Sequence, residues 1–237
     1  MIFGIPSYKR PECKTIDMLL GYGIAPNDIY VSLQTEEEVD QYKAIHPTVN
    51  YIFREADCAA GNRNTLLMTI GAPIVLLDDD ITSMAVKLPG HNFRRLEDGK
   101  SLLNGISEIS DLAKENKCSL VGIAATTNDI IARSRERYTF DCLLQGSFLI
   151  FLDTVLFNEK WKMVEDYEIS LRIIRQGRHI LRANAFSANK PKNGTNLGGL
   201  HDRYANGELR TWISRLSQVY PEFKPNKDRT GGHIKFE

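Results

Sequence analysis

Short runs of apolar residues alternate with amphipathic stretches through the first two thirds of the chain. Runs of this length are typical of strands buried on both faces of a sheet, and the stretches between them have the spacing of helices. The apolar runs predict strands at 2–5, 29–33, 51–53, 74–77, 119–124 and 146–151. Because strands and helices alternate, we expect a Rossmann-like α/β fold whose central sheet is mostly parallel and is flanked by helices.

The clearest helix signal follows Thr35. Three glutamates come directly after it, as in a capping box, and Val39, Tyr42 and Ile45 then recur at helical spacing. Amphipathic spacing predicts further helices at about 61–70, 102–113, 163–175 and 209–219. Two stretches lack this periodicity: residues 87–99 predict a surface excursion or small hairpin, and residues 184–206 predict a long loop.

Length and composition narrow the class of protein. A chain of 237 residues fits one domain better than two, and its size requires no metal or disulfide for stability. Thirty Lys and Arg residues balance thirty Asp and Glu residues, so no overall charge attracts nucleic acid or an anionic membrane. Four widely spaced cysteines disfavour a zinc site and a dense disulfide framework. Since no apolar run has membrane-spanning length, we expect a cytoplasmic protein with no membrane contact.

The strongest chemical signal is the run Asp78, Asp79 and Asp80 directly after the apolar segment 74–77. Three adjacent carboxylates at the end of a buried strand repel one another and need solvent or a cation. In an extended chain Asp78 and Asp80 point to the same side and can share one Mg²⁺ or Mn²⁺ ion with diphosphate oxygens. The alternative is a solvated turn in which Asp80 caps a helix, but open α/β sheets bind ligands at this edge, which favours the metal site.

Two further groups of polar residues stand at the starts of predicted helices. Glu165 and Asp166 lie where the helix dipole stabilises negative charge, and there a carboxylate can also serve as general base for a hydroxyl group. Arg63 and Asn64 open the helix before the acidic strand, where N–H groups and a guanidinium suit an anionic ligand. The alternatives are simple dipole stabilisation, an asparagine cap, and Arg63 as structural partner of an aspartate.

In this order the motifs resemble those of glycosyltransferases with the GT-A fold, family 2-type enzymes in particular. Residues 5–11 resemble the segment that cups the nucleotide, and residues 61–64 resemble a Gly-x-x-x-Ala-Arg-Asn element with Asn62 in place of a small residue. The aspartate run resembles the DxD metal motif, and Glu165 with Asp166 resembles the ED pair of inverting members. The resemblance covers roughly residues 1–178. It implies one GT-A domain over 1–237, with a nucleotide-sugar half at 1–85, an acceptor half at 86–183 and an elaborated C-terminal region at 184–237.

The resemblance also implies the ligands and the residues that bind them. The donor would be a nucleoside-diphosphate sugar, with a UDP-sugar favoured, and Mn²⁺ or Mg²⁺ would be held by Asp80, Asp78 and His201, with His233 as the alternative histidine. The residues implied to bind the donor are Pro6, Ser7, Tyr8, Arg10, Ser32, Gln34, Arg63, Asn64, Asp78 and Asp79.

The same resemblance implies an inverting course in which Asp166 removes the proton of the acceptor hydroxyl group. Glu165 would hold either that base or the acceptor in place. A retaining course becomes the alternative if Asp166 lies far from the acceptor.

The acceptor depends on the C-terminal residues, which are locally basic and include Tyr204, Trp212 and Tyr220. Basic residues interleaved with aromatic ones suit nucleic acid, whereas the alternative is a solvated surface whose aromatics belong to the core. The layout resembles small phage and base-J-type DNA glycosyltransferases, which implies a hydroxymethylated pyrimidine in DNA as acceptor and, for a phage enzyme, the host cytoplasm. We place this acceptor ahead of a polysaccharide or other glycan, although the neutral net charge counts against it.

Two functions of other classes stay open. A nucleotidyltransferase would also use an N-terminal nucleotide pocket and acidic metal ligands, but such enzymes usually carry a glycine-rich basic loop after the first strand, and residues 7–11 contain no glycine. A non-catalytic nucleotide-sugar-binding module would keep the fold without turnover. The carboxylates Asp78, Asp80 and Asp166 argue against such a module, which has no need of them.

Overall fold

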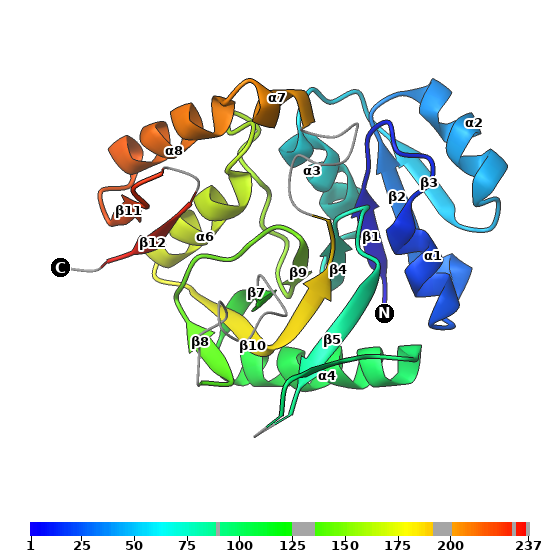
Figure 1. Ribbon diagram of the computed structural model, residues 1–237, viewed down its shortest axis with the longest axis horizontal. Helices are drawn as coiled ribbons and strands as arrows, with labels where there is room; N and C mark the ends of the chain where they lie inside the picture. The colour runs from blue at the N-terminus through cyan, green and yellow to red at the C-terminus, as the bar shows by residue number, and fades with distance from the viewer. Residues whose placement is uncertain (89–90, 125–135, 192–200, 229–230, 236–237) are drawn as a thin grey trace.

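The computed structural model describes residues 1–88, 91–124, 136–191, 201–228 and 231–235, which form a mixed sheet covered by helices (Figure 1). The strand order is β3-β2-β1-β4-β9-β7-β10-β5-β6, and β8 pairs with β10. This arrangement confirms the predicted α/β fold. The strands are β1 (Phe3–Pro6), β2 (Ile29–Leu33), β3 (Asn50–Phe53), β4 (Ile74–Leu77), β5 (Ser83–Lys87), β6 (Phe93–Arg95), β7 (Cys118–Ala124), β8 (Tyr138–Phe140), β9 (Phe148–Phe151) and β10 (His179–Asn189).

Most strands of the sheet run in one direction. Strand β1 pairs in parallel with β2 and β4, β2 pairs in parallel with β3, and β7 pairs in parallel with β10. Strand β9 lies antiparallel between β4 and β7, and therefore leaves those two strands pointing the same way. The carboxyl ends of β1, β2, β3, β4, β7 and β10 consequently meet at one edge of the sheet.

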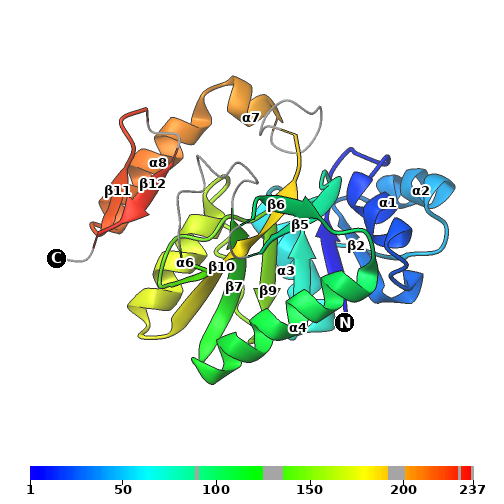
Figure 2. The same cartoon turned by 60° about the horizontal axis from the view of Figure 1, so that its bottom comes forward.

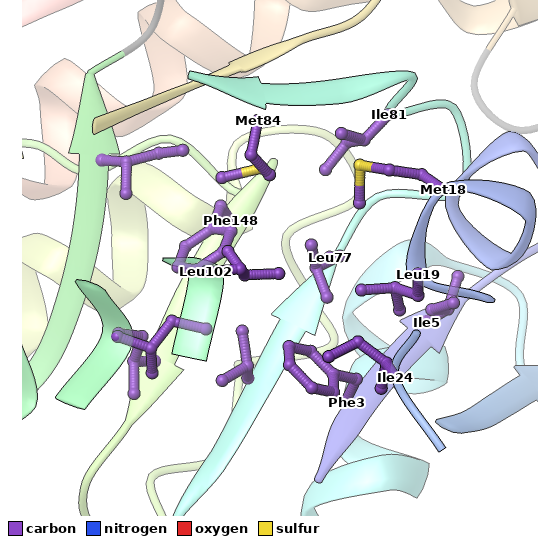
Figure 3. Packing of buried hydrophobic residues seen from close by; sticks show 14 of the residues in the cluster. Phe3, Ile5, Met18, Leu19, Ile24, Leu77, Ile81, Met84, Leu102 and Phe148 are labelled. Carbon is purple, nitrogen blue, oxygen red and sulfur yellow. The ribbon is translucent and has the colours of Figure 1, made fainter. Parts of the chain in front are cut away.

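Helices bury both faces of the sheet because successive side chains of a strand point to opposite sides. In β4, Val75 and Leu77 join a core cluster with α1 (Lys14–Gly21) and α4 (Gly99–Glu115), while Ile74 and Leu76 join a second cluster with α3 (Ala59–Ile70) and α6 (Glu165–Arg175). Figure 2 shows α4 crossing the sheet on the first face. Figure 3 shows the packing of that cluster, including Phe3, Ile5, Leu19, Leu77, Leu102 and Phe148.

The C-terminal region packs against α6 and lies to one side of the sheet (Figure 2). It contains α7 (His201–Ala205), α8 (Glu208–Val219) and a small hairpin of β11 (Phe223–Pro225) and β12 (Gly232–Ile234). Trp161 and Leu171 from the α6 side meet Ile213, Leu216 and Tyr220 in a third apolar cluster. Within the residues that the structure describes, no helix combines the length and the apolar character needed to cross a lipid bilayer.

Most predicted elements are present, including α2 (Glu36–Ile45), whose first turn is capped by the side chain of Thr35. The surface excursion or hairpin predicted at 87–99 is the β5–β6 hairpin, which begins earlier, at Ser83, and ends at Arg95. The predicted loop at 184–206 is wrong in part. Residues up to Asn189 belong to β10, α7 begins at His201, and residues 192–200 lie outside the described part of the chain. Strand β10 escapes sequence analysis because its second half contains Asn184, Ala185 and Ser187 rather than an apolar run, and pairing with β7 and β5 stabilises it instead. Helix α1 was also not predicted.

Candidate functional site

A pocket of about 700 Å³ opens at the carboxyl ends of β1, β2 and β4. The order of strands reverses there, since the chain leaves β1 toward β2 and β3 on one side and later places β4 on the other. Crevices at such switch points are the usual ligand sites of open α/β sheets. The predicted site residues that line this pocket are Pro6, Ser7, Tyr8, Arg10, Gln34, Arg63, Asp78, Asp79, Asp80, Glu165 and Asp166.

The segment after β1 forms one wall of the pocket and is held by side chains of α2. The Glu38 carboxylate accepts hydrogen bonds from the backbone N–H of Lys9 at 2.6 Å and of Gln34 at 3.3 Å. The Tyr42 hydroxyl accepts from the backbone N–H of Arg10 at 2.9 Å. These contacts shape a turn in which Lys9 has a φ of 54°, a conformation that usually favours glycine. Glu38 and Tyr42 therefore support a loop that contains no glycine.

Asp79 turns toward this N-terminal segment and is only 6% exposed. Its carboxylate accepts hydrogen bonds from the Ser7 hydroxyl at 2.6 Å and from the Arg10 guanidinium at 2.7 Å. Burial raises the pKa of Asp79 to about 6, although the charge of Arg10 opposes that change. The same guanidinium lies 3.6 Å from Asp80. The middle aspartate thus anchors Arg10 instead of facing solvent.

Asp78 lies between two basic side chains. Arg63 Nη2 donates to Asp78 Oδ1 at 2.9 Å, and Lys190 Nζ donates to Asp78 Oδ2 at 2.8 Å. Burial acts to raise the pKa of Asp78, but the charges of Lys190 and Arg63 outweigh it and lower the pKa to about 2. Asp78 is therefore a permanent anion whose two oxygens both have basic partners.

Arg63 joins the two acidic groups that the sequence singled out. It rises from α3 with its side chain 7% exposed, and besides Asp78 it donates to Glu165 Oε1 at 2.7 Å and to the Gly146 carbonyl at 3.2 Å. Arg63 is therefore a structural partner of an aspartate, Asp78, as in the alternative interpretation of this residue. Its contact with the ribose or diphosphate of a ligand stays a prediction.

Glu165 and Asp166 form the first turn of α6 and face the pocket. The Asp166 carboxylate accepts hydrogen bonds at 2.8 Å from the backbone N–H groups of Gly146 and Tyr167, which fix its orientation. Burial raises the pKa of both acids, that of Glu165 to about 7, because Arg63 compensates only part of the cost. Within the described residues, the buried Oε2 atom of Glu165 has no hydrogen-bond partner.

Three predicted site residues do not line the pocket. The hydroxyl group of Ser32 donates to Asn62, which itself lines the pocket, and Asn64 exchanges hydrogen bonds with the backbone of Phe157. Both residues are buried and position their neighbours. His201 is the first residue of α7 and is not part of the pocket lining.

Sequence analysis missed Lys190, which lines the pocket at the end of β10. A lysine directly after a strand was the available signal, but the strand itself was not predicted. The Glu38 and Tyr42 side chains were likewise read only as part of an amphipathic helix, because their contacts to Lys9 and Arg10 join segments about thirty residues apart.

The charge of the cluster bears on the predicted Mn²⁺ or Mg²⁺ ion. Five carboxylates surround three basic side chains, so full ionisation leaves two negative charges in excess; the acids are Asp78, Asp79, Asp80, Glu165 and Asp166, and the bases are Arg10, Arg63 and Lys190. Carboxylate oxygens and a surplus of two charges fit a hard divalent cation. As arranged, however, the described residues contain no group of three or more His, Cys, Asp or Glu side chains placed to hold one. The ion therefore stays a prediction. The ammonium group of Lys190 lies beside Asp78, where the ion was expected.

The C-terminal aromatic residues are packed against one another. The rings of Trp161 and Trp212 lie 6.0 Å apart, those of Trp161 and Tyr220 lie 6.5 Å apart, and the Arg215 guanidinium stacks on both tryptophans. Tyr204 is packed on the same cluster. The rings of Trp161, Trp212 and Tyr220 serve the core, as in the alternative interpretation of this region, whereas Tyr204 also lines the pocket. The structure lends no support to stacking of these rings on nucleic-acid bases.

No protein-family model and no curated protein sequence matches the chain. Among solved structures, the chain is similar to CMP:2-keto-3-deoxy-manno-octonic acid synthetase complexed with CTP, with 10% sequence identity and a TM-score of 0.49 over 90% of this chain and 98% of that one. The interpretation as a DNA glycosyltransferase is corrected here, because the similar structure is a synthetase complexed with CTP and no comparison supports sugar transfer to a pyrimidine or glycan. The chain has a Rossmann-like α/β fold, and its assignment to the glycosyltransferases is not supported.

Proposed function

We propose that this protein is a nucleotidyltransferase, which joins the nucleoside monophosphate part of a nucleoside triphosphate to a sugar or sugar acid. One observation carries the proposal: the charged side chains of the pocket converge between the segment after β1 and the start of α6. In nucleotidyl transfer the reacting atom is the α-phosphorus. The reaction therefore needs positively charged groups next to the phosphates themselves to offset their negative charge.

The nucleoside part has a place beside β1 and β2. Pro6, Tyr8 and Gln34 line this side of the pocket, and the segment that carries them is fixed by Glu38 and Tyr42. A segment held by protein side chains serves the purpose that glycine serves elsewhere, which is to let the backbone turn closely around a ligand. The lack of glycine in residues 7–11 is therefore no obstacle to nucleotide binding.

The triphosphate would lie along Arg10, Arg63 and Lys190. Arginine and lysine side chains donate charge-assisted hydrogen bonds to phosphate oxygens, and these three already point into the pocket. Asp78 and Asp80 are the residues that would hold a divalent cation, which would neutralise the phosphates when bound.

Asp166 is the group that would accept a proton from the sugar. The acceptor oxygen attacks the α-phosphorus, a new O–P bond forms, and the bond from the α-phosphorus to the bridging oxygen of the β-phosphate breaks. Pyrophosphate leaves with that electron pair, and the acceptor proton passes to the Asp166 carboxylate. The raised pKa of Asp166 makes it a stronger base than an exposed aspartate, and its two backbone hydrogen bonds hold it toward the pocket.

The experiment compares two products. The purified chain is incubated with each nucleoside triphosphate, Mg²⁺ or Mn²⁺ and a panel of sugars and sugar acids, and pyrophosphate release is measured together with the mass of the product. In parallel, nucleotide sugars are offered with glycan acceptors and release of nucleoside diphosphate is measured. Pyrophosphate release that requires the acceptor supports the proposal. Nucleoside diphosphate release alone contradicts it, and nucleotide binding without turnover favours the binding module.

A further inference from the structure

The position of Lys190 is fixed by strand pairing and not by its own side chain. Its neighbour Asn189 pairs with Ser83 at the start of β5, donates from Nδ2 to the Ser83 hydroxyl at 2.9 Å, and accepts from the Thr82 N–H at 2.9 Å. Strand β5 begins three residues after Asp80 in the sequence. The end of β10 is therefore bound to the chain segment that directly follows the aspartate run, so the first residue beyond β10 is brought beside that run.

The side chain of Lys190 occupies one oxygen of Asp78. Its Nζ lies 2.8 Å from Asp78 Oδ2, with 21% of the lysine side chain exposed, and Arg63 occupies the other oxygen. A lysine side chain is positively charged at neutral pH. Lys190 thus places a charge of +1 directly beside Asp78.

A divalent cation and this ammonium group need the same oxygen. Mg²⁺ binds carboxylate oxygens at about 2.0–2.1 Å, so an ion on Asp78 Oδ2 would stand no more than about 5 Å from the present Nζ position. Two cations that close repel strongly in a site largely shielded from water. With Lys190 in place, the surplus of negative charge around the aspartate run is also smaller by one, which weakens the attraction for any ion that does not displace the lysine.

We propose that Lys190 is a built-in competitor for the divalent cation at Asp78, so that the nucleotide-free chain binds such ions weakly. Entry of a nucleotide brings phosphate oxygens that accept from the ammonium group and draw it away from Asp78. The lysine then contacts the phosphates, and the ion enters with the nucleotide rather than before it. The inference concerns the nucleotide-free pocket and does not depend on which group is transferred.

Binding of Mn²⁺ alone tests this inference. The loss of the free Mn²⁺ signal in electron paramagnetic resonance is titrated at pH 8 without nucleotide, and circular dichroism checks that each variant is folded. We expect Lys190→Gln and Lys190→Ala to bind Mn²⁺ at least about tenfold more tightly than the wild type, because the competing charge is gone. Lys190→Arg keeps a cation at Asp78 and should bind as weakly as the wild type.

Two controls locate the effect. Lys162→Gln removes the same charge from a more exposed pair, in which Lys162 lies 2.6 Å from the pocket-lining Asp57, and it should leave Mn²⁺ affinity near the wild-type value. Asp78→Asn added to Lys190→Gln should abolish the gain. Equal affinities of Lys190→Gln and the wild type overturn the inference, as does a gain that Lys162→Gln shares or that survives the loss of Asp78. If Lys190→Gln gains Mn²⁺ affinity but the wild type releases no pyrophosphate with any nucleotide, only the proposed function is contradicted.

Discussion

Asp78 and Glu165 face the same pocket and share the same guanidinium, yet they differ in charge state. The pKa of Asp78 falls to about 2 and that of Glu165 rises to about 7. Asp78 is half-buried and Glu165 is buried, and both accept from Arg63 at similar distances, 2.9 and 2.7 Å. The difference lies in what else each one contacts: Asp78 has Lys190 as a second cation, while Glu165 has Asp166 beside it and an oxygen without a partner among the described residues.

This comparison shows that burial does not by itself set the charge of a carboxylate. Desolvation raises the pKa of both acids, and the number of nearby cations decides whether that rise persists. The side of the pocket near β4 therefore carries a fixed negative charge that attracts cations. On the side near α6, the pKa of Glu165 is raised to about 7 and that of its neighbour Asp166 is raised as well. Raised pKa values suit carboxylates that accept protons.

The largest effect is expected when the shared guanidinium is removed. Among the residues that the structure describes, Arg63→Met leaves Asp78 with Lys190 and Glu165 without a side-chain partner, and breaking a buried ion pair costs about 3–5 kcal/mol. We expect this loss in the free energy of unfolding, measured by urea denaturation at pH 8. Arg54→Met is the matched control, since Arg54 pairs with Glu159 at the surface and exposed pairs contribute at most about 1 kcal/mol. Equal losses in the two variants would contradict the shared role of Arg63.

The second test separates the two acids of α6. Asp166→Asn removes the basicity of the side chain and keeps one of its two orienting hydrogen bonds, because an amide has a single acceptor oxygen. Pyrophosphate release should fall by about 10²–10⁴-fold while nucleotide affinity stays close to that of the wild type. Affinity is measured by calorimetry and release by a coupled assay. Wild-type turnover in this variant would exclude Asp166 as the base.

The third test uses pH. Folding raises the pKa of Glu165 from its usual value near 4.5 to about 7, so the folded state binds the proton more tightly than the unfolded state does. The resulting penalty is absent below pH 4.5, grows by at most about 1.4 kcal/mol per pH unit, and is complete above pH 7. Glu165→Gln lacks this titration.

The quantity to measure is the difference in unfolding free energy between the wild type and Glu165→Gln from pH 4.5 to 8, because titrating groups that do not interact with Glu165 cancel in it. We expect the wild type to lose stability relative to the variant as pH rises through this range. A difference that stays constant would show that Glu165 is ionised throughout, like Asp78.

The smallest effect concerns the wall beside β1. Glu38→Gln weakens the charge-assisted hydrogen bonds to the N–H groups of Lys9 and Gln34, and we expect a loss of about 1–2 kcal/mol in the free energy of unfolding. Nucleotide affinity should fall as well, because the segment that carries Tyr8 and Arg10 loses a support. Unchanged affinity despite the loss of stability would mean that the segment is held by Tyr42 alone.

Local patterns predicted most of the elements around the pocket. The apolar runs gave β2 and β4 with their observed ends, and the capping residue Thr35 placed the start of α2. These runs also placed the aspartate run after β4 at the sheet edge where open α/β sheets bind ligands. Strand β10 was missed, and with it Lys190, since no local pattern marks a strand that depends on its neighbours for pairing.

The sequence by itself determined the α/β fold and the residue types available at the carboxyl edge of the sheet, because strand periodicity, helix caps and acidic runs act over a few residues. Only the tertiary structure decided how the charges are paired. Arg63 reaches Asp78 across 15 positions and Glu165 across 102, and Lys190 reaches Asp78 across 112. Electrostatic energy depends on distance in space and on burial, and neither is encoded in the spacing of residues along the chain.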